Sequence, residues 1–212
     1  MVETAKTAGR PYRGASADER RDERKRRLIE AGIKVIGREG YAATTVRAVC
    51  AEAGLTERYF YEAIGDRERL LGAVYAHLVQ QLQAQIAQTI LAAGTESPSE
   101  LARLGLSGYF GAMRDNPDAA RILLFEILGV SPEVTRLSQS AVADFAMLIR
   151  MTARRLPQPA VPDQLEDLVT AGLVGSVVFI AMSWFMEGFK RDLDDVVESA
   201  LTIFNAVVAA KA

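Results

Sequence analysis

Arginine and tyrosine side chains gather in one short stretch of this sequence, in a pattern that suits contact with DNA. Phe60 and Ile64 are four positions apart, so in a helix they point to the same, buried side. Arg58, Tyr59 and Tyr61 then face outward. An arginine can donate two hydrogen bonds to guanine O6 and N7, and a tyrosine can bond phosphate or touch a thymine methyl. The stretch therefore predicts a recognition helix in the DNA major groove.

A second short helix is expected just before this one, joined to it by a tight turn. Apolar residues recur there at helical spacing, so one face of that helix is buried. These residues are Val46, Val49, Cys50 and Ala53. Gly54 stands where a helix ends in a left-handed residue. The neighbouring positions suit the same arrangement, with Thr44 or Thr45 capping the first helix, Leu55 as a buried pivot and Thr56 capping the second.

The sequence GLTERYFYEAIGDRERLL, which begins at Gly54, resembles the helix-turn-helix of TetR-type transcriptional repressors. That family shows a glycine, a small apolar residue and a serine or threonine. An aromatic-rich run follows, and then a basic residue at the start of the next helix. The resemblance covers residues 28–75. It implies contacts with DNA bases and backbone from Thr45, Arg47, Thr56, Glu57, Arg58, Tyr59 and Tyr61, and a phosphate contact from Arg67.

Acidic residues share the exposed side of the predicted recognition helix. Glu57 and Glu62 could accept hydrogen bonds from cytosine amino groups, or they could tether Arg58. Arg58 stands where a small residue is frequent in the family, and Ala63 replaces a frequent histidine or aromatic residue. The base sequence preferred by this chain therefore cannot be borrowed from its relatives.

The charge of the chain is unevenly distributed. Its 212 residues, half of them hydrophobic, suffice for one or two domains. The formal net charge is −2, but the first 70 residues carry +3 and the remainder carries −5. Six basic residues stand between positions 20 and 27. They could contact DNA phosphates, or they could form a solvated helix face with internal ion pairs.

Cys50 and His77 are the single cysteine and the single histidine of the chain. One cysteine offers neither an intramolecular disulfide nor a cysteine-based zinc site, and we expect a reducing, cytoplasmic compartment. Cys50 is interpreted as a core residue. His77 is interpreted as a surface or interdomain residue, because no second metal ligand is near it in the sequence. We expect no metal and no cofactor, and the N-terminus shows no secretory signal.

Helix signals divide the chain into three parts. Residues 1–15 are polar and are interpreted as a disordered tail, residues 16–65 as the DNA-binding domain, and residues 66–212 as a ligand-binding and dimerisation domain. Asp66 can cap a long helix whose apolar stripe has no breaker until Gly94. We expect this helix to join the two domains as a lever.

The rest of the chain also predicts helices. Expected starts are Ser97-Pro98, Asn116-Pro117, Ser131-Pro132, Pro162 and Asp192, and the matching ends are Arg114, Leu128, Leu156, residues 185–188 and Ala209. A proline-rich linker occupies residues 156–162. No segment alternates with period two over a useful length. The fold class predicted is all-α, with about nine helices.

Residues 168–186 contain no charged side chain over 19 positions. That length could span a membrane. A helix that is apolar all round can instead be buried in a globular core, and the small residues Gly172, Gly175 and Ser176 favour close helix contact. With the last helix, this segment carries more apolar surface than one small domain buries. Small and polar residues within the segment and the amphipathic pattern of the rest of the chain argue against a membrane span. The family resemblance implies a homodimer through these last two helices, and its two heads would read a palindromic operator.

Aromatic residues and methionines are frequent in the second domain. They suit a pocket for a small apolar or aromatic molecule, although each could equally be ordinary core. The candidate ligand-binding residues are Phe110, Met113, Phe125, Met147, Met151, Phe179, Met182 and Trp184.

Three functions compete on these features. The favoured one is a sequence-specific transcriptional regulator, a repressor of double-stranded DNA sites that a small-molecule effector releases by tilting the long helix after Asp66. A DNA-binding structural or autoregulatory protein without a ligand is the alternative. An enzyme is disfavoured, because the chain has no phosphate-binding loop and no nucleophile motif.

Overall fold

The computed structural model describes residues 17–95, 97–153 and 163–209, and within them the chain is all-α, as predicted. The elements are α1 (Ala17–Glu39), α2 (Val46–Ala53), α3 (Glu57–Ala63), α4 (Arg67–Ala92), α5 (Pro98–Asp115), α6 (Pro117–Arg121), the π-helical turn η1 (Ile122–Glu126), α7 (Pro132–Ala153), α8 (Asp163–Met186) and α9 (Leu193–Ala209). The predicted tail and the proline-rich linker lie outside the described residues.

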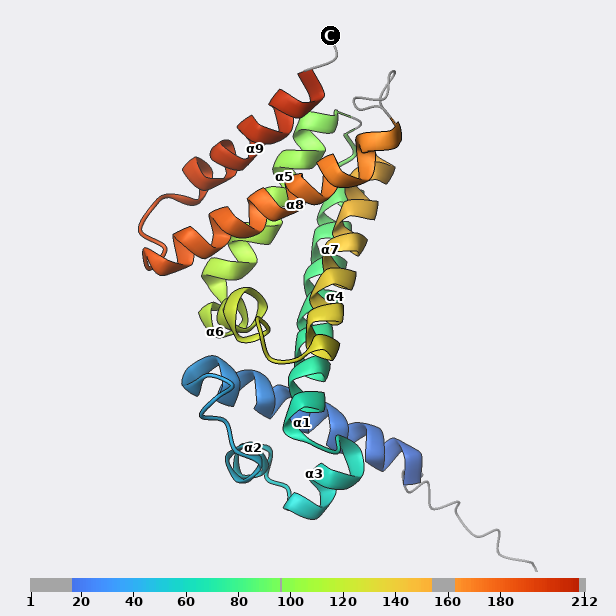
Figure 1. Cartoon of the computed structure of the whole chain (residues 1–212), viewed down its shortest axis with the longest axis vertical. Coiled ribbons are helices and arrows are strands. Elements are labelled where there is room, and N and C mark those ends of the chain that lie inside the picture. Colours follow the sequence, from blue (N-terminus) through green and yellow to red (C-terminus); the bar gives the residue numbers. More distant parts are fainter. Residues whose placement is uncertain (1–16, 96, 154–162, 210–212) are drawn as a thin grey trace, which may run out of the picture.

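Helix α4 connects the two ends of the molecule. Helices α1, α2 and α3 lie together at one end, and α5, α8 and α9 form the body at the other (Figure 1). Asp66 caps α4 as predicted, since its Oδ1 accepts from the amide of Arg69 at 2.8 Å. The helix has 26 residues and is therefore about 39 Å long at ~1.5 Å per residue. The apolar stripe of α4 is buried from Leu70 to Ile86, so both ends of the molecule pack against this one helix.

Local interactions set the turn between α2 and α3. The Oγ1 of Thr45 accepts from the amide of Ala48 at 3.1 Å, which identifies Thr45 as the cap of α2. Gly54 ends α2 with φ 62°, in the left-handed region predicted for it. Arg27 of α1 donates to the carbonyl oxygen of Ala53 at 2.5 Å. The first helix therefore fixes the end of the second.

Two predicted caps do not form side-chain hydrogen bonds. Thr56 occupies the N-cap of α3, but its hydroxyl makes no capping bond. Ser97 occupies the N-cap of α5 in the same way. There the hydroxyl of Thr95 donates to Glu100 at 2.6 Å and accepts from the amide of Ser97 at 3.2 Å, so Thr95 supplies the side-chain hydrogen bonds at this helix start.

The segment after Asn116 differs from the predicted continuous helix. Asn116 caps α6 as expected, accepting from the amide of Ala119 at 3.1 Å. The α-helix ends at Arg121, however, and continues as η1 before the chain leaves helical structure. Single π-helical turns insert an extra residue per turn and are frequent at functional sites. This turn re-aims the side chains on either side of it.

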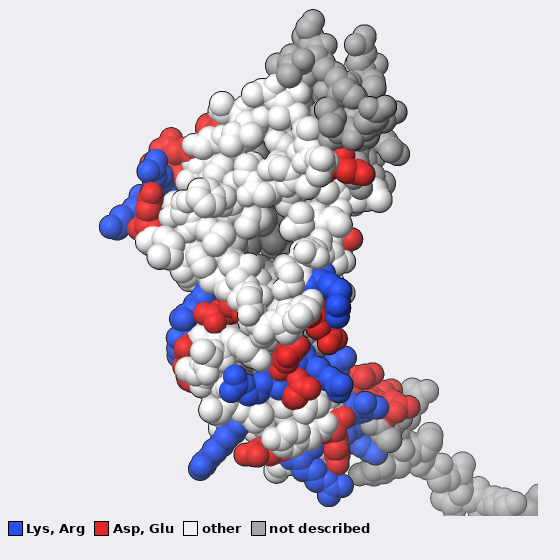
Figure 2. Space-filling model, viewed as in Figure 1, with Lys and Arg blue, Asp and Glu red and all other residues white. Residues whose placement is uncertain are grey.

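Helix α8 is not buried on all sides within one chain. By length and composition, Asp167–Met186 is the one described helix segment that could cross a membrane, and only 22% of its most apolar window is buried. Leu168, Phe179 and Met186 are exposed by 70–75%. Figure 2 shows that the face carrying α8 and α9 is almost free of charged side chains, whereas charges cover the end formed by α1–α3. An apolar face of this kind marks an interaction surface.

Candidate nucleic-acid interface and ligand cavity

Helix α3 presents the predicted residues to solvent. Phe60 is completely buried, while Tyr59 and Tyr61 are 38% and 57% exposed. The rings of Phe60 and Tyr61 pack edge to face with centroids 5.6 Å apart, which steadies the exposed ring on the buried one. The inward and outward faces of this helix are therefore as the spacing predicted.

Arg58 is tethered on the surface of α3. Its Nε donates to Oε1 of Glu62 at 2.8 Å, one helical turn away, and its side chain is 84% exposed. The tethering role considered for Glu62 is thus the one that this structure shows. An exposed pair of this kind adds little to helix stability, because solvent screens it. Breaking this pair costs little free energy, so Arg58 is available to hydrogen-bond a guanine.

Arg24 of α1 stacks on Tyr59 of α3, the predicted recognition helix. Its guanidinium carbon lies 4.7 Å from the ring centroid of Tyr59, within cation–π range. Its Nε is buried and has no hydrogen-bond partner among the described residues. The pair links two helices that are distant in sequence, so no spacing rule could have found it. Arg24 holds the Tyr59 ring in place and brings a cation beside it.

The remaining predicted contacts lie at the same end of the molecule. Thr45, Arg47, Thr56 and Glu57 are all exposed. Arg67 packs on Tyr41, with its guanidinium 5.1 Å from the ring centroid and Nη2 donating to the Tyr41 carbonyl oxygen at 3.4 Å.

The basic residues of α1 do not all behave alike. Arg26 pairs with Glu23 and Glu30 along its own helix, which is the solvated-face alternative. Arg27 is occupied at the end of α2, where it bonds the Ala53 carbonyl oxygen. Arg20 and Arg21 are exposed near the start of the described chain. The basic segment is thus partly an internal scaffold.

Cys50 and His77 carry no separate site. Burial raises the pKa of the Cys50 thiol, and the negative charge of Glu57 adds to the shift. The thiol is therefore neutral and packs in the core, as predicted. His77 lies between α4 and α1 beside Asp22, Lys25 and Arg26. The residues that the structure describes contain no group of three or more His, Cys, Asp or Glu placed to hold a metal ion.

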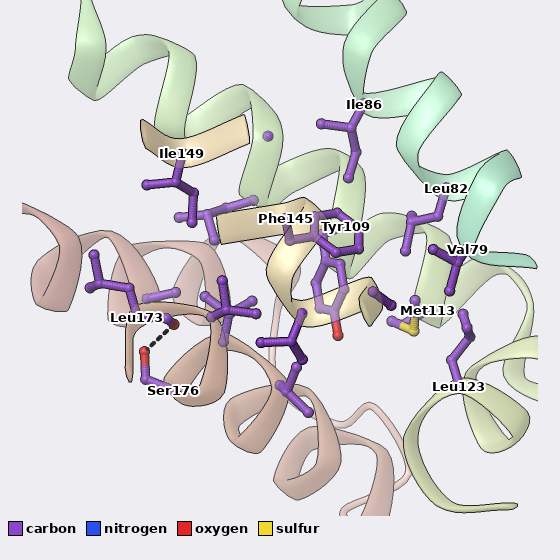
Figure 3. Close-up of a pocket in the computed structure, with 18 of the residues that line it drawn as sticks. Val79, Leu82, Ile86, Tyr109, Met113, Leu123, Phe145, Ile149, Leu173 and Ser176 are labelled. Atoms are coloured by element: carbon purple, nitrogen blue, oxygen red, sulfur yellow. Dashed lines mark hydrogen bonds between the residues drawn. The ribbon is translucent and has the colours of Figure 1, made fainter. Parts of the chain in front are cut away.

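A cavity of about 300 Å³ lies inside the body. Helices α4, α5, α7, α8 and α9 and the residues around η1 contribute its walls (Figure 3). This volume is at the small end of the ~300–1,000 Å³ range of ligand pockets. The described lining residues are almost all apolar, among them Leu82, Ile86, Leu123, Phe145, Leu173 and Val177.

The structure separates the predicted ligand residues. Met113 and Met182 line the cavity. Phe110 and Trp184 are buried in the core beside it, and the indole nitrogen of Trp184 donates to the Arg191 carbonyl oxygen at 3.0 Å. The others lie elsewhere: Phe125 packs on Phe185, Met147 and Phe179 are exposed, and the Met151 side chain is outside the described residues.

Residues missed by the sequence reasoning make up most of the cavity wall. Tyr109 and Phe145 are aromatic, and the rest are chiefly leucine, isoleucine and valine. The predicted ligand residues were all aromatic residues or methionines. The aliphatic side chains of the wall were not predicted, because in the sequence they resemble ordinary core residues. Burial next to empty space is a tertiary property that no local pattern carries.

The segment around η1 joins the cavity to the end formed by α1–α3, the predicted DNA-binding end. Leu123 and Leu124 of η1, and Ile127 just after it, line the cavity. At the two ends of the same turn, the carboxylate of Glu126 accepts from Arg121 Nε at 2.8 Å and from the Tyr41 amide at 2.7 Å. One short turn thus touches both the cavity and the chain that leaves α1.

Helix α1 and the start of α6 approach each other very closely. Arg121 Nη1 donates to the Gly37 carbonyl oxygen at 3.4 Å. A Cβ added at Gly37 would lie only 2.4 Å from Cβ of Asp118, so this contact requires glycine. The contact between the body and the predicted DNA-binding end therefore combines close packing at Gly37 with a hydrogen bond from Arg121.

Comparison with known sequences gives the same family from several directions. Residues 28–74 match the family described as bacterial regulatory proteins, tetR family. The uncharacterized HTH-type transcriptional regulator YerO of Bacillus subtilis (strain 168) is 25% identical over 118 residues, which are 56% of this chain and 40% of that protein. The HTH-type transcriptional regulator BetI of Brucella anthropi is 29% identical over 134 residues, 63% of each chain. The matches thus span less than two thirds of these relatives.

Solved structures share the fold at low identity. FadR from Bacillus subtilis, a transcriptional regulator in complex with stearoyl-CoA, superposes with a TM-score of 0.74 at 16% identity, covering 87% of this chain and 97% of that one. A tetR-family transcriptional regulator from Streptomyces coelicolor gives 0.73 at 14% identity, covering 90% and 82%. These likenesses extend the agreement from the DNA-binding end to the whole described fold.

Proposed function

Since this chain belongs to the TetR family of bacterial regulatory proteins, we propose that it is a cytoplasmic protein that binds a specific DNA sequence and regulates transcription. One observation carries the proposal. The exposed face of α3 presents Arg58, Tyr59 and Tyr61, and Phe60 anchors that face from inside. These side chains offer both base-edge and phosphate contacts.

We propose further that the protein is a repressor that a small apolar or aromatic molecule releases from its operator. The cavity supports this, because its walls include α4 and residues around η1, and both of these reach the DNA-binding end. A bound molecule would favour one tilt of α4 over another. It shifts DNA affinity only to the extent that it binds the two states unequally. The stearoyl-CoA bound by the FadR neighbour is in keeping with an apolar effector.

A homodimer through α8 and α9 completes the proposal. Phe179 and Met186 leave an apolar face on α8, and Gly172 and Gly175 have open space around them in the single chain. A second copy would cover this face better than a membrane, because the rest of the described body has the mixed surface of a globular protein. Two DNA-binding ends about 34 Å apart would then read a palindrome.

Footprinting on the DNA that flanks the coding region of this protein tests the proposal. We expect protection of one palindromic site, with its two halves centred about one helical turn apart. The footprinting experiment does not require the effector to be known. If no site is protected above the level of random DNA, the regulatory function proposed for this chain fails.

A further inference from the structure

The described residues that line the cavity offer no charged side chain that would neutralise a charged ligand. None of the described residues that line it is an Asp, Glu, Lys, Arg or His. An ionised group moved from water into such a space would lose its hydration without gaining a partner, which is strongly unfavourable. The part of an effector that enters this space is therefore uncharged.

Four side-chain hydroxyl groups are the polar exceptions among the described lining residues. Those of Ser138 and Ser176 are already used, since they donate to the carbonyl oxygens of Thr135 at 2.9 Å and Leu173 at 2.7 Å. The hydroxyl groups of Tyr75 and Tyr109 line the cavity, and the hydrogen bonds among the described residues include none from either of them. In Figure 3 the hydroxyl of Tyr109 points into the space between the labelled side chains.

The two tyrosines are neighbours and stay protonated. Burial raises the pKa of Tyr75 to about 12. Burial also raises the pKa of Tyr109, and the nearby Tyr75 adds to the shift. Both phenols therefore keep their protons at any working pH and can donate a hydrogen bond. Because these donors face the cavity without a protein partner, a ligand that supplies an acceptor can form a hydrogen bond there and gains affinity.

We propose that the effector is an uncharged, elongated apolar molecule with one hydrogen-bond acceptor, such as a ketone, aldehyde or ester carbonyl, held by Tyr109 and Tyr75. This assignment rests on the proposed function, because it names the chemical class of the molecule that acts there. A volume of about 300 Å³ equals that of roughly ten liquid waters at ~30 Å³ each, so it admits a molecule of about ten non-hydrogen atoms. Tyr75 lies on α4, so the same hydrogen bond reaches the helix that runs to the DNA-binding end.

The test compares 2-decanone with decanoate, which have nearly the same length but differ in charge at pH 7. Isothermal titration calorimetry of the full chain would measure both. We expect 2-decanone to bind and decanoate to bind at least about a hundredfold more weakly, since its carboxylate has no cation to meet. Tyr109→Phe should weaken 2-decanone binding about three- to tenfold, the value of one neutral hydrogen bond. Tyr75→Phe should act in the same direction.

Matched variants make the test specific. Tyr61→Phe removes the same hydroxyl from the exposed face of α3, and Ser199→Ala removes an exposed hydroxyl outside the cavity that is bonded to the Asp195 carbonyl oxygen at 2.8 Å. Both should leave 2-decanone binding unchanged. Equal or tighter binding of decanoate would overturn the proposal. So would failure of 2-decanone to bind at its solubility limit, or an affinity that neither tyrosine substitution changes.

The ligand class and the release mechanism fail in different ways. If 2-decanone binds as expected but operator affinity stays constant, the ligand class stands and the proposed release fails. If decanoate is preferred and lowers operator affinity, release stands and the uncharged class is overturned.

Discussion

Replacing Glu126 with alanine should loosen the contact between the body and the DNA-binding end. Its carboxylate accepts from the Tyr41 amide at 2.7 Å and from Arg121 Nε at 2.8 Å. Its side chain is only 17% exposed, so water replaces these bonds poorly. Glu126→Ala removes both and leaves the Tyr41 amide without its acceptor.

The expected loss follows from these two bonds. A hydrogen bond to a charged group is worth about 1.5–3 kcal/mol. The bond from Arg121 counts for less than that, because the arginine is 37% exposed and solvent screens the pair. The free energy of unfolding should therefore fall by about 2–3 kcal/mol in total. Because the turn also touches the cavity, the variant should further reduce the effect of a bound ligand on DNA affinity.

Urea denaturation followed by circular dichroism measures the first effect. Protein concentration must be held constant, because association shifts apparent stability. The matched control is Glu187→Ala, which breaks an exposed pair with Arg191 at 2.9 Å and should change the stability little, because solvent screens that pair. If Glu126→Ala destabilises the protein no more than this control does, the proposed connection through η1 is refuted.

Three further outcomes are expected. Arg67→Ala should weaken binding to all DNA sequences and lower the slope of log affinity against log salt concentration by about one, as loss of one phosphate contact does. An unchanged slope would mean that Arg67 packs on Tyr41 without contacting a phosphate. Tyr75→Phe should flatten the alkaline loss of stability. The folded pKa of Tyr75 is about 12 against ~10 unfolded, so a stabilisation of about 3 kcal/mol is complete below pH ~10 and is lost as the pH rises to about 12. A variant that loses as much stability between pH ~10 and about 12 as the unaltered protein would contradict this. Phe179→Asp should convert the proposed dimer to monomers in sedimentation equilibrium, and a dimer that survives would contradict an interface on α8.

Helix boundaries could be predicted wherever short-range interactions decide them. Thr45, Gly54 and Asp66 act within one turn of their own positions, and the structure places each as its residue type suggested. The faces of α3 followed from spacing in the same way, because a four-residue interval keeps Phe60 and Ile64 on one side. These features need no knowledge of the rest of the chain.

Features that depend on packing between distant segments could not be predicted. The π-helical turn forms where Glu126 reaches Tyr41, and the stacking of Arg24 on Tyr59 joins two separate helices. The cavity is lined mostly by aliphatic residues, whose composition is that of an ordinary core. The exposure of α8 was likewise hidden, because an apolar sequence does not say whether its partner lies in the same chain.

The central claim is that the exposed face of α3 reads DNA bases. Fluorescence anisotropy with the footprinted operator and with a scrambled duplex of equal length tests it most directly. Arg58→Ala and Tyr59→Ala should each lower operator affinity by about 1–3 kcal/mol while binding to the scrambled duplex changes little. If both variants bind the operator as tightly as the unaltered protein, α3 is not the reading element and the account is contradicted.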